Sequence, residues 1–485
     1  MLSQLRLQPP APIDVDIEPH LNGVFAPVHD EIDAPDLRVE GELPVGLEGD
    51  FLRNGPNPRF APLGSYLYPL DGDGMLHRVQ LRGGTARYTN RFVWTPALSA
   101  EDAFGAGLWP GFGAMGYTPG PHLVGPALAY TRKDTPSINI VRHAGRMLAL
   151  AESRPPFLMS DELDTIGQET FGELLPAGMT AHPKIDPTTG EMVVFCYHLR
   201  APFLTWSVIG RDGHVSRADT PIGGLDRPVL IHDMALTPTY VVLILAPLFF
   251  DIAAALGSGS PLSWEPDQGT RIALIPRDGG PVRWLSTNAF WLSHTANAYD
   301  DPTEAMSVAG RTSPVVVLDF AEWDEPAGFT NGGSTKGSLV RLRLHPNTGV
   351  VHREVLCDRE VEFPRVDDRA ITRRHRVIGA SLRSNSHDLS AGDHDTLGWY
   401  DCHTGRMTTW RADRLALGEQ VFAPHQAHDD QQHGWWLTIA TDRADLTSRL
   451  LIFPAEHPSS GPVATIHLPQ RVPHGLHGTW QPSQD

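Results

Sequence analysis

The sequence predicts an all-β protein, and three observations support that prediction. Glycine and proline are both abundant, with 46 and 43 residues among 485, and long helical periodicity is scarce. Short apolar or β-branched runs recur around turn signals, as in a series of β-hairpins. The hairpins continue along nearly the whole chain, and a propeller is one arrangement that protects the edges of many such small sheets. We therefore expect a β-propeller.

Six hairpins are expected in chain order. Each consists of two strand-like runs joined by a tight turn that contains Asp-Gly, Thr-Gly or Gly-Gly. They cover residues 77–93, 184–198, 207–218, 272–285, 339–356 and 397–410. These units have no fixed sequence period, which indicates an irregular propeller with long insertions.

The chain is expected to form one domain with additions. Residues 1–35 are proline-rich and read as an extended N-terminal arm, and residues 36–485 read as a single propeller domain. Cap insertions are expected at about 96–130 and 241–260. The second insertion contains an apolar run of about 14 residues, which is too short to span a bilayer. It is either a buried strand followed by a short helix or an apolar lip that touches a membrane surface or guides a substrate.

Composition excludes several classes of protein. The net charge of −18 argues against a sequence-independent nucleic-acid binder. The three cysteines, Cys196, Cys357 and Cys402, are too few and too scattered for a disulfide framework. No signal-peptide-like apolar stretch and no run long enough to span a membrane is found. We expect a cytoplasmic protein, with peripheral membrane contact and oligomeric state left open.

Four histidines stand in four separate short motifs: His182, His232, His294 and His477. Each lies beside strand-like residues or a turn, and none is within helical reach of another, so only a closed fold would bring them together. Neutral imidazole is a preferred ligand of iron, zinc, copper and nickel. The chain has 23 histidines, and a single histidine is more often a surface or core residue than a ligand. The spacing therefore does not select these four by itself.

Several motifs in fixed order resemble those of the carotenoid cleavage oxygenases, a family that includes apocarotenoid-, stilbene- and phenylpropene-cleaving enzymes. The resemblance runs from about residue 24 to the C-terminus. GDFLRNGPNPRF (49–60) and LDGDGMLHRV (70–79) look like the family's N-terminal signatures. GRMLALAESRPPFLM (145–159) and the four histidine motifs follow in the family's order.

The resemblance implies a seven-bladed propeller with a dome of loops and short helices over its metal-bearing face. It implies one Fe(II) per chain, held by His182, His232, His294 and His477. It also implies three glutamates that orient imidazoles and map onto Glu152, Glu362 and Glu419. His477 is preferred to the nearby His474 as ligand because the HGTW motif keeps the family pattern.

The implied reaction takes an apolar alkene and O2 and splits the C=C bond into two carbonyl products. No further catalytic group is expected beyond the metal centre. Family members that cleave stilbenes or phenylpropenes typically carry a lysine where this chain has Ala151. The alanine favours a carotenoid or apocarotenoid, with a stilbene or phenylpropene as the alternative. Lys133 is either a substitute cation or a solvated surface residue.

A hydrophobic substrate tunnel is expected near the insertions. Its candidate lining residues, which also read as ordinary packing residues, are Ala151, Phe104, Trp109, Phe249 and His474. Two other functions remain open: isomerisation coupled to ester cleavage, as in one animal branch of the family, and a non-catalytic propeller that binds an apolar ligand.

Overall fold

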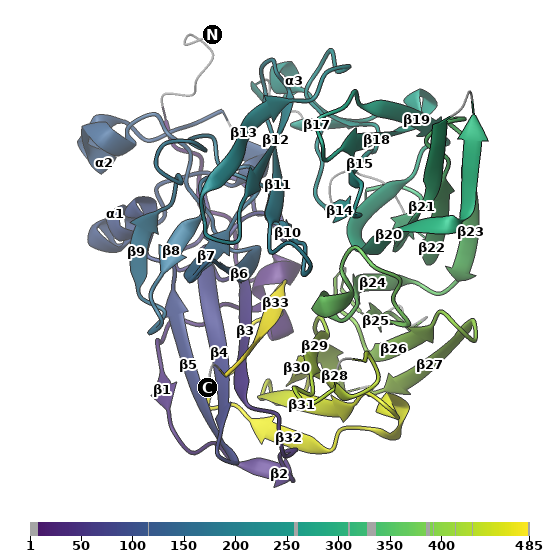
Figure 1. Cartoon of the computed structure of the whole chain (residues 1–485). Coiled ribbons are helices and arrows are strands. Elements are labelled where there is room, and N and C mark those ends of the chain that lie inside the picture. Colours follow the sequence, from purple (N-terminus) through teal and green to yellow (C-terminus); the bar gives the residue numbers. More distant parts are fainter. Residues whose placement is uncertain are drawn as a thin grey trace.

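The computed structural model describes residues 8–483, except 115, 257–259, 309–310, 327–335, 385–388, 391, 413 and 429. Its strands form seven antiparallel sheets arranged as blades in a ring, together with one small hairpin (Figure 1). This architecture confirms the expected all-β class and the seven-bladed propeller.

The blades follow one another in chain order. The first blade contains β1 (Asp33–Ala34), β5 (Thr85–Phe92), β4 (Gly74–Arg82), β3 (Gly49–Pro56) and β33 (Gly478–Pro482). The second contains β6 (Asn139–His143), β7 (Arg146–Leu150), β8 (Phe157–Met159) and β9 (Thr165–Gln168). The third contains β10 (Lys184–Ile185), β11 (Met192–Tyr197), β12 (Leu204–Ile209) and β13 (Val215–Pro221).

The next three blades have four strands each. The fourth blade contains β14 (Met234–Leu236), β15 (Tyr240–Leu245), β18 (Thr270–Pro276) and β19 (Arg283–Thr287). The fifth contains β20 (Trp291–Val308), β21 (Arg311–Trp323), β22 (Gly337–Leu344) and β23 (Val351–Cys357). The sixth contains β24 (Val361–Arg365), β25 (Val377–Leu382), β26 (Thr396–Asp401) and β27 (Arg406–Arg411).

The seventh blade joins the two ends of the chain. Its strands are β28 (Leu415–Leu417), β29 (Val421–Pro424), β30 (Gly434–Asp442), β31 (Ser448–Pro454), β32 (Ala464–His467) and β2 (Val39–Gly41). The N-terminal strand β2 thus pairs with the last blade, while the C-terminal strand β33 pairs with β3 of the first blade. Two such pairings close the ring, because each places a strand from one end of the chain beside strands from the other end.

All six expected hairpins are present. They correspond to the antiparallel pairs β4–β5, β10–β11, β12–β13, β18–β19, β22–β23 and β26–β27. The turn between β4 and β5 consists of Gly83 and Gly84, with φ angles of 55° and 73°. A two-residue hairpin turn of this kind needs positive φ at both positions, which glycine adopts without steric cost.

The hydrophobic core lies between the blades. One cluster of buried apolar side chains separates each pair of neighbouring blades, including the first and seventh. Side chains of each strand alternate between the two faces of its sheet, so every blade is buried on both sides. This packing fixes the positions of the innermost strands, which surround the axis.

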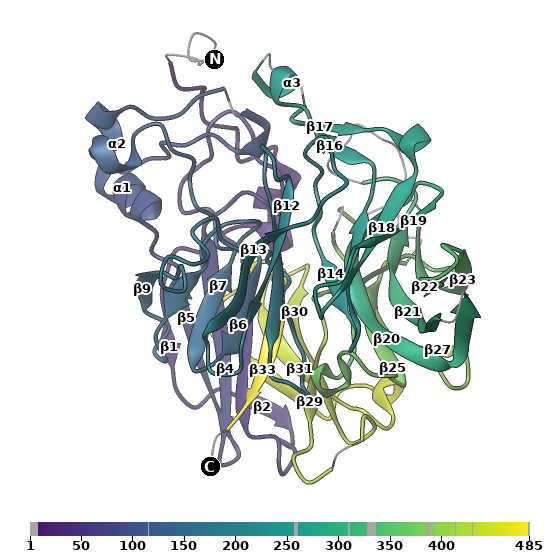
Figure 2. The ribbon, with the colours of Figure 1, turned by 45° about the horizontal axis from the view of Figure 1, so that its top comes forward.

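Short helices and loops cover one end of the ring (Figure 2). The helices are α1 (Pro96–Phe104), α2 (Pro121–Leu128) and α3 (Ile252–Leu256). Thr95 caps α1 by accepting a hydrogen bond from the Leu98 backbone N–H, and Gly105 ends it with a φ of 83°. Single-turn 3₁₀ helices occur at Pro19–Leu21, Gly23–Phe25, Phe112–Ala114, Pro266–Gln268, Asp368–Ala370 and Pro458–Ser460.

The two expected insertions contribute differently to this end. Residues 96–130 supply α1 and α2, whereas 241–245 belong to the buried strand β15 of the fourth blade. The hairpin of β16 (Leu248–Phe250) and β17 (Leu262–Trp264) encloses α3. No helix in the described part of the chain is long and apolar enough to cross a membrane. The arm-and-domain division and the membrane contact of 241–260 stay predictions.

Candidate metal centre

The four histidines lie at the starts of innermost strands from four different blades. His182 is two residues before β10, His232 is two residues before β14, and His477 immediately precedes β33. His294 is the fourth residue of β20. These strands contact their counterparts in neighbouring blades, so the ring brings together residues separated by up to 295 positions in the sequence.

The imidazoles converge. Nε2 of His182 is 3.0 Å from Nε2 of His232, which is 3.2 Å from Nε2 of His294. The ring of His477 lies 4.5 Å from that of His182, centroid to centroid. One ring nitrogen from each of the four lies within 4.8 Å of the others. We call His182, His232, His294 and His477 the four-histidine cluster.

Three glutamate carboxylates contact three of these rings at Nδ1. Nδ1 of His294 donates to Oε2 of Glu362 at 2.6 Å, and Nδ1 of His477 donates to Oε1 of Glu419 at 2.9 Å. His232 and Glu152 form the corresponding ion pair through Nδ1 and Oε1. A carboxylate only accepts, so the proton sits on Nδ1 and the lone pair of Nε2 faces the cluster.

Glu362 is held by a distorted backbone. Its Oε1 accepts from Trp323 Nε1 at 3.0 Å, and its Oε2 also accepts from the Phe363 backbone N–H at 2.6 Å. Phe363 has a φ of 51° and lies at a register shift between β24 and β25. A bulky residue in this region costs of order 1–3 kcal/mol. The distortion turns the carboxylate toward His294 and lets the Phe363 ring stack on that imidazole, with centroids 5.2 Å apart.

Glu419 has a charged partner besides its histidine. Arg365 Nη1 donates to its Oε1 at 3.0 Å, and the Gly478 backbone N–H donates to its Oε2 at 2.8 Å. Because Arg365 belongs to the sixth blade and Gly478 to the first, this carboxylate connects two blades across the seventh.

Among the described residues, no glutamate is paired with His182. Its Nδ1 is 4.0 Å from Oδ1 of Asp233, beyond hydrogen-bond reach. Its backbone N–H donates to Thr180 Oγ1 at 3.0 Å. Asp233 instead accepts from Lys184 Nζ at 2.8 Å and from the backbone N–H of Thr295 at 2.7 Å. His182 is therefore placed by its backbone and by the residues next to it.

Electrostatics favour the neutral form of two cluster histidines, His182 and His477. Burial, with a smaller effect from the neighbouring imidazoles, lowers the pKa of His182 well below its usual value. Burial also lowers the pKa of His477, to about 4, despite the opposing charge of Glu419. At His232 burial acts in the same direction, but Glu152 and other carboxylates outweigh it and raise the pKa. A neutral imidazole is the form that binds a metal ion.

Two of the carboxylates, Glu362 and Glu419, stay ionised in spite of their burial. Burial raises the pKa of Glu362, yet the opposing interactions with His294, the Phe363 N–H and Trp323 bring it down to about 2. Arg365 and His477 likewise hold the pKa of Glu419 below its usual range against the effect of burial. Their negative charge would offset the positive charge of a bound metal ion.

These donors fit one divalent transition-metal ion. A ring nitrogen lies about 2.1 Å from its ion, so two nitrogens at right angles are about 3.0 Å apart, close to the observed separations. Nε2 of His477 is buried and has no hydrogen-bond partner among the described residues, a costly state that coordination would relieve. Imidazole ligands suit iron, zinc, copper and nickel.

A cavity of about 570 Å³ on the dome side extends as far as Glu152, the partner of His232, and none of the four cluster histidines is among its described lining residues. We call it the dome cavity. Glu152, the partner of His232, lines it together with Ala151, and exposed Leu199 and Arg200 mark its outer part. Six aromatic residues contribute to its wall: Phe60, Trp109, Phe112, Tyr117, Tyr197 and Phe250.

The structure places the five expected tunnel residues in different surroundings. Ala151 and Trp109 line the dome cavity. Phe104 ends α1 with its side chain 55% exposed, and Phe249 packs under the guanidinium of Arg227, 3.4 Å from its ring centroid. Neither is among the described residues that line the dome cavity. Because side chains alternate along a strand, Phe250 takes the cavity position in place of Phe249.

His474 lies outside the cluster and outside the described wall of the dome cavity. It is buried, and its ring packs on that of Phe25, with centroids 5.2 Å apart. Its backbone N–H donates to the carbonyl of Val24 at 2.8 Å. The extra histidine therefore helps to attach the N-terminal segment to the propeller.

Lys133 lines the dome cavity and is not a solvated surface residue. Its Nζ lies 2.6 Å from Oδ1 of Asp73 and 2.6 Å from Oε2 of Glu101. Glu101 also accepts from the backbone N–H of Trp109 at 3.3 Å. The lysine thus connects α1 to the first blade and helps to place the Trp109 wall of the cavity.

Sequence reasoning missed several residues that support the cluster, notably Asp233, Thr295, Arg365 and Trp323. Asp233 and Thr295 each directly follow a cluster histidine, in IHDMALT and HTANAYDD. Adjacency to a ligand candidate was therefore an available signal for these two. Arg365 and Trp323 carry no such signal, because only blade packing brings them to Glu419 and Glu362.

A seven-bladed propeller with four histidines from four blades gathered at its axis defines a class of proteins with a metal-capable centre. The chain matches the family model described as "Retinal pigment epithelial membrane protein" over residues 25–482. It is 33% identical to a carotenoid cleavage oxygenase of Mycobacterium tuberculosis, with 96% of this chain and 98% of that protein covered. It is also 29% identical to resveratrol cleavage oxygenase 1 of Aspergillus fumigatus, with 96% of each covered.

Solved structures agree with these relatives. The Pseudomonas brassicacearum lignostilbene dioxygenase superposes with a TM-score of 0.84 at 27% identity, covering 98% of this chain and 100% of that one. A variant of the Synechocystis apocarotenoid oxygenase gives 0.81 at 25% identity, covering 94% and 97%. The chain belongs to the carotenoid cleavage oxygenase family and is an enzyme of the carotenoid-cleavage dioxygenase type.

Proposed function

We propose that the chain is an Fe(II)-dependent dioxygenase that cleaves a C=C bond of a carotenoid or apocarotenoid with O2 and gives two carbonyl products. One Fe(II) per chain is held by His182, His232, His294 and His477. The observation that carries the proposal is the convergence of one ring nitrogen from each of the four histidines, with a carboxylate on Nδ1 of three of them.

The bound metal would supply O2 activation beside the alkene. The chain's own residues contribute by positioning the imidazoles and the alkene. Glu152, Glu362 and Glu419 keep the Nδ1 protons in place and the Nε2 lone pairs available. On this proposal the aromatic residues in the wall of the dome cavity exclude water from the alkene. No general base is needed, because no proton is transferred when the two oxygen atoms add across C=C.

Ala151 favours the apolar class of substrate. It is buried in the wall of the dome cavity next to Glu152. A methyl group there contacts a hydrocarbon chain favourably and offers no charge to a phenol. Lys133, the nearby cation, is already neutralised by Asp73 and Glu101, so releasing it for a phenol would leave two buried carboxylates without it.

A stilbene or phenylpropene is the second candidate substrate. It is supported by the likeness to a lignostilbene dioxygenase, which includes the whole of that chain, and by the resveratrol-cleaving relative. On this alternative Tyr117 and Tyr197, which both line the dome cavity, would bind the phenol in place of a lysine.

Aerobic incubation of the Fe(II)-loaded protein with four alkenes tests the proposal. The panel is β-apo-8′-carotenal, β-carotene, resveratrol and isoeugenol, with products identified by mass spectrometry under ¹⁸O₂. Labelled aldehydes from a carotenoid or apocarotenoid alone are expected. Cleavage of resveratrol or isoeugenol instead would select the second candidate, and absence of any labelled product would contradict the oxygenase proposal.

A cytoplasmic location with peripheral membrane contact through 241–260 is also proposed. Incubation with liposomes followed by flotation tests the contact. Recovery of all the protein in the soluble fraction would contradict it.

A further inference from the structure

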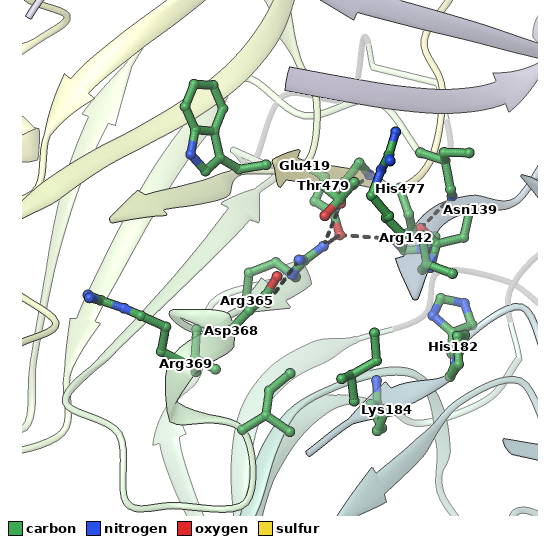
Figure 3. Close-up of a pocket in the computed structure, with 18 of the residues that line it drawn as sticks. Asn139, Arg142, His182, Lys184, Arg365, Asp368, Arg369, Glu419, His477 and Thr479 are labelled. Carbon is green, nitrogen blue, oxygen red and sulfur yellow. Dashed lines mark hydrogen bonds and ion pairs between the residues drawn. The ribbon is translucent and has the colours of Figure 1, made fainter. Parts of the chain in front are cut away.

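We propose that the metal ion enters the four-histidine cluster through a second cavity that runs along the propeller axis, on the side away from the dome. This inference rests on the proposed function, since it concerns how the same cluster is loaded. The second cavity has a volume of about 800 Å³, and we call it the axial cavity. Figure 3 shows His182 and His477 at its inner part.

The lining residues show that the axial cavity joins the surface to the cluster. His182, His294 and His477 line it and are each less than 10% exposed. Its wall also includes exposed residues, which are Asp161, Pro187, Asp368, Gln426 and Pro482. The wall comes from β6, β10, β14, β20, β24 and β33, the strands nearest the axis in six blades.

The wall of the axial cavity is polar and its charges are paired. Five cationic and five anionic side chains line it, so the wall carries no formal net charge: Arg82, Arg142, Lys184, Arg365 and Arg369, with Asp50, Asp161, Asp233, Asp368 and Glu419. Each cation has a carboxylate partner within 4.0 Å. An incoming hydrated cation therefore meets hydrogen-bonding groups and no isolated positive charge.

The dome cavity is a poor route for the same ion. Six aromatic side chains line it, against two, Phe363 and Trp480, in the axial cavity. None of the four cluster histidines is among the described residues that line the dome cavity, whereas His182, His294 and His477 line the axial cavity. The two cavities have no described lining residue in common, so the ion and the alkene would use separate passages.

A pair of matched substitutions separates the two routes. Thr479 lies on β33 in the axial cavity (Figure 3), and Thr118 lines the dome cavity; both are half-buried. Metal-free full-length protein is mixed with excess Co²⁺, and uptake is followed by the visible absorption of the bound ion. We expect Thr479→Trp to slow uptake at least about tenfold, with the final content unchanged at one ion per chain.

Thr118→Trp is the matched control. It is expected to leave the rate of Co²⁺ uptake unchanged while raising KM for the alkene. Uptake slowed equally by the two substitutions, or unaffected by Thr479→Trp, would overturn the inference. Failure of the wild-type chain to bind one Co²⁺ at equilibrium would instead overturn the proposed metal centre itself.

A reversible modification at the same position tests the route independently of whether the tryptophan variant folds. Thr479→Cys is folded, stripped of metal and treated with a bulky disulfide-forming reagent, with treated wild type correcting for the native cysteines. Uptake should slow after treatment and recover when a reductant releases the adduct. An uptake rate that does not respond to the adduct would contradict entry along the axis.

Discussion

The carboxylate of Asp233 lies 2.8 Å from the ammonium of Lys184, and this contact connects two strands that carry cluster histidines. Lys184 is two residues after His182, and Asp233 directly follows His232. The same carboxylate accepts from the backbone N–H and the hydroxyl of Thr295, at 2.7 and 2.8 Å. One buried side chain thus fixes β10, β14 and β20 relative to one another.

Asp233→Asn should therefore weaken the site without removing a ligand. The change leaves Lys184 unpaired and loosens three histidine-bearing strands, so the affinity for Co²⁺ should fall about 10–100-fold. The free energy of unfolding of the metal-free protein should fall by about 3–5 kcal/mol. Calorimetric titration and urea denaturation measure the two effects. Asp212→Asn, in an exposed pair with His214, is the matched control, and equal effects of both changes would contradict this role.

His477→Ala should abolish stable metal binding. The side chain supplies one of four converging nitrogens, and its loss should cost more than the roughly 10–100-fold typical of an outer hydrogen-bond partner. Metal content after gel filtration measures the effect. His474→Ala, which removes a buried imidazole three residues away, should keep one ion per chain. Retention of metal by the His477 variant, or its loss from the His474 variant, would contradict the ligand assignment.

Glu419→Gln and Glu362→Gln should differ. Both remove a negative charge behind an imidazole, and each should lower the affinity for Co²⁺ about 10–100-fold. Only Glu419 is also paired with Arg365, so its replacement leaves this half-buried guanidinium with Asp368 as its remaining described carboxylate partner. Thermal unfolding of the two metal-free variants should show the larger destabilisation for Glu419→Gln, and the reverse order would contradict the role assigned to Arg365.

Ala151→Lys should change the choice of substrate. A lysine at this position would project a cation into the dome cavity beside Glu152, where burial in an apolar wall opposes its charge. The kcat/KM for an apocarotenoid should fall by at least about tenfold, and that for resveratrol should rise. Ala151→Met is the control for side-chain length. Equal losses in both variants would mean that bulk, and not charge, decides the effect.

Acid should weaken the fifth blade through Asp319. Burial alone raises the pKa of Asp319, but hydrogen bonds from Arg341 and His375 outweigh it and hold the pKa below its ordinary value. The contribution of the ionised group is therefore present above the unfolded pKa of about 3.9 and is lost as the pH falls through the lower folded value.

Asp319→Asn tests that pH dependence. The variant should be less stable than wild type by about 3–5 kcal/mol at pH 7, because Arg341 loses a buried partner. The difference in the free energy of unfolding between wild type and Asp319→Asn should become smaller as the pH falls below about 4. Urea denaturation at pH 7 and pH 3 measures this difference in the free energy of unfolding. A difference that is larger at pH 3 than at pH 7 would contradict the lowered pKa of Asp319.

The sequence by itself determined the hairpins and the candidates for the site. Turn chemistry such as Gly83-Gly84 between two strand-like runs is local, and every expected hairpin is present for that reason. The resemblance selected four histidines out of 23 and named the glutamates that lie behind three of them. These conclusions needed only short segments or their order along the chain.

Only the tertiary structure decided which distant side chains meet. Strand alternation turned Phe250 and not Phe249 toward the dome cavity, and the pairing of Lys133 with Glu101 and Asp73 depends on how α1 sits on the first blade. Arg365 reaches Glu419 because neighbouring blades pack face to face. Such contacts join residues 32 to 60 or more positions apart, and closure of the ring, not local sequence, sets their distances.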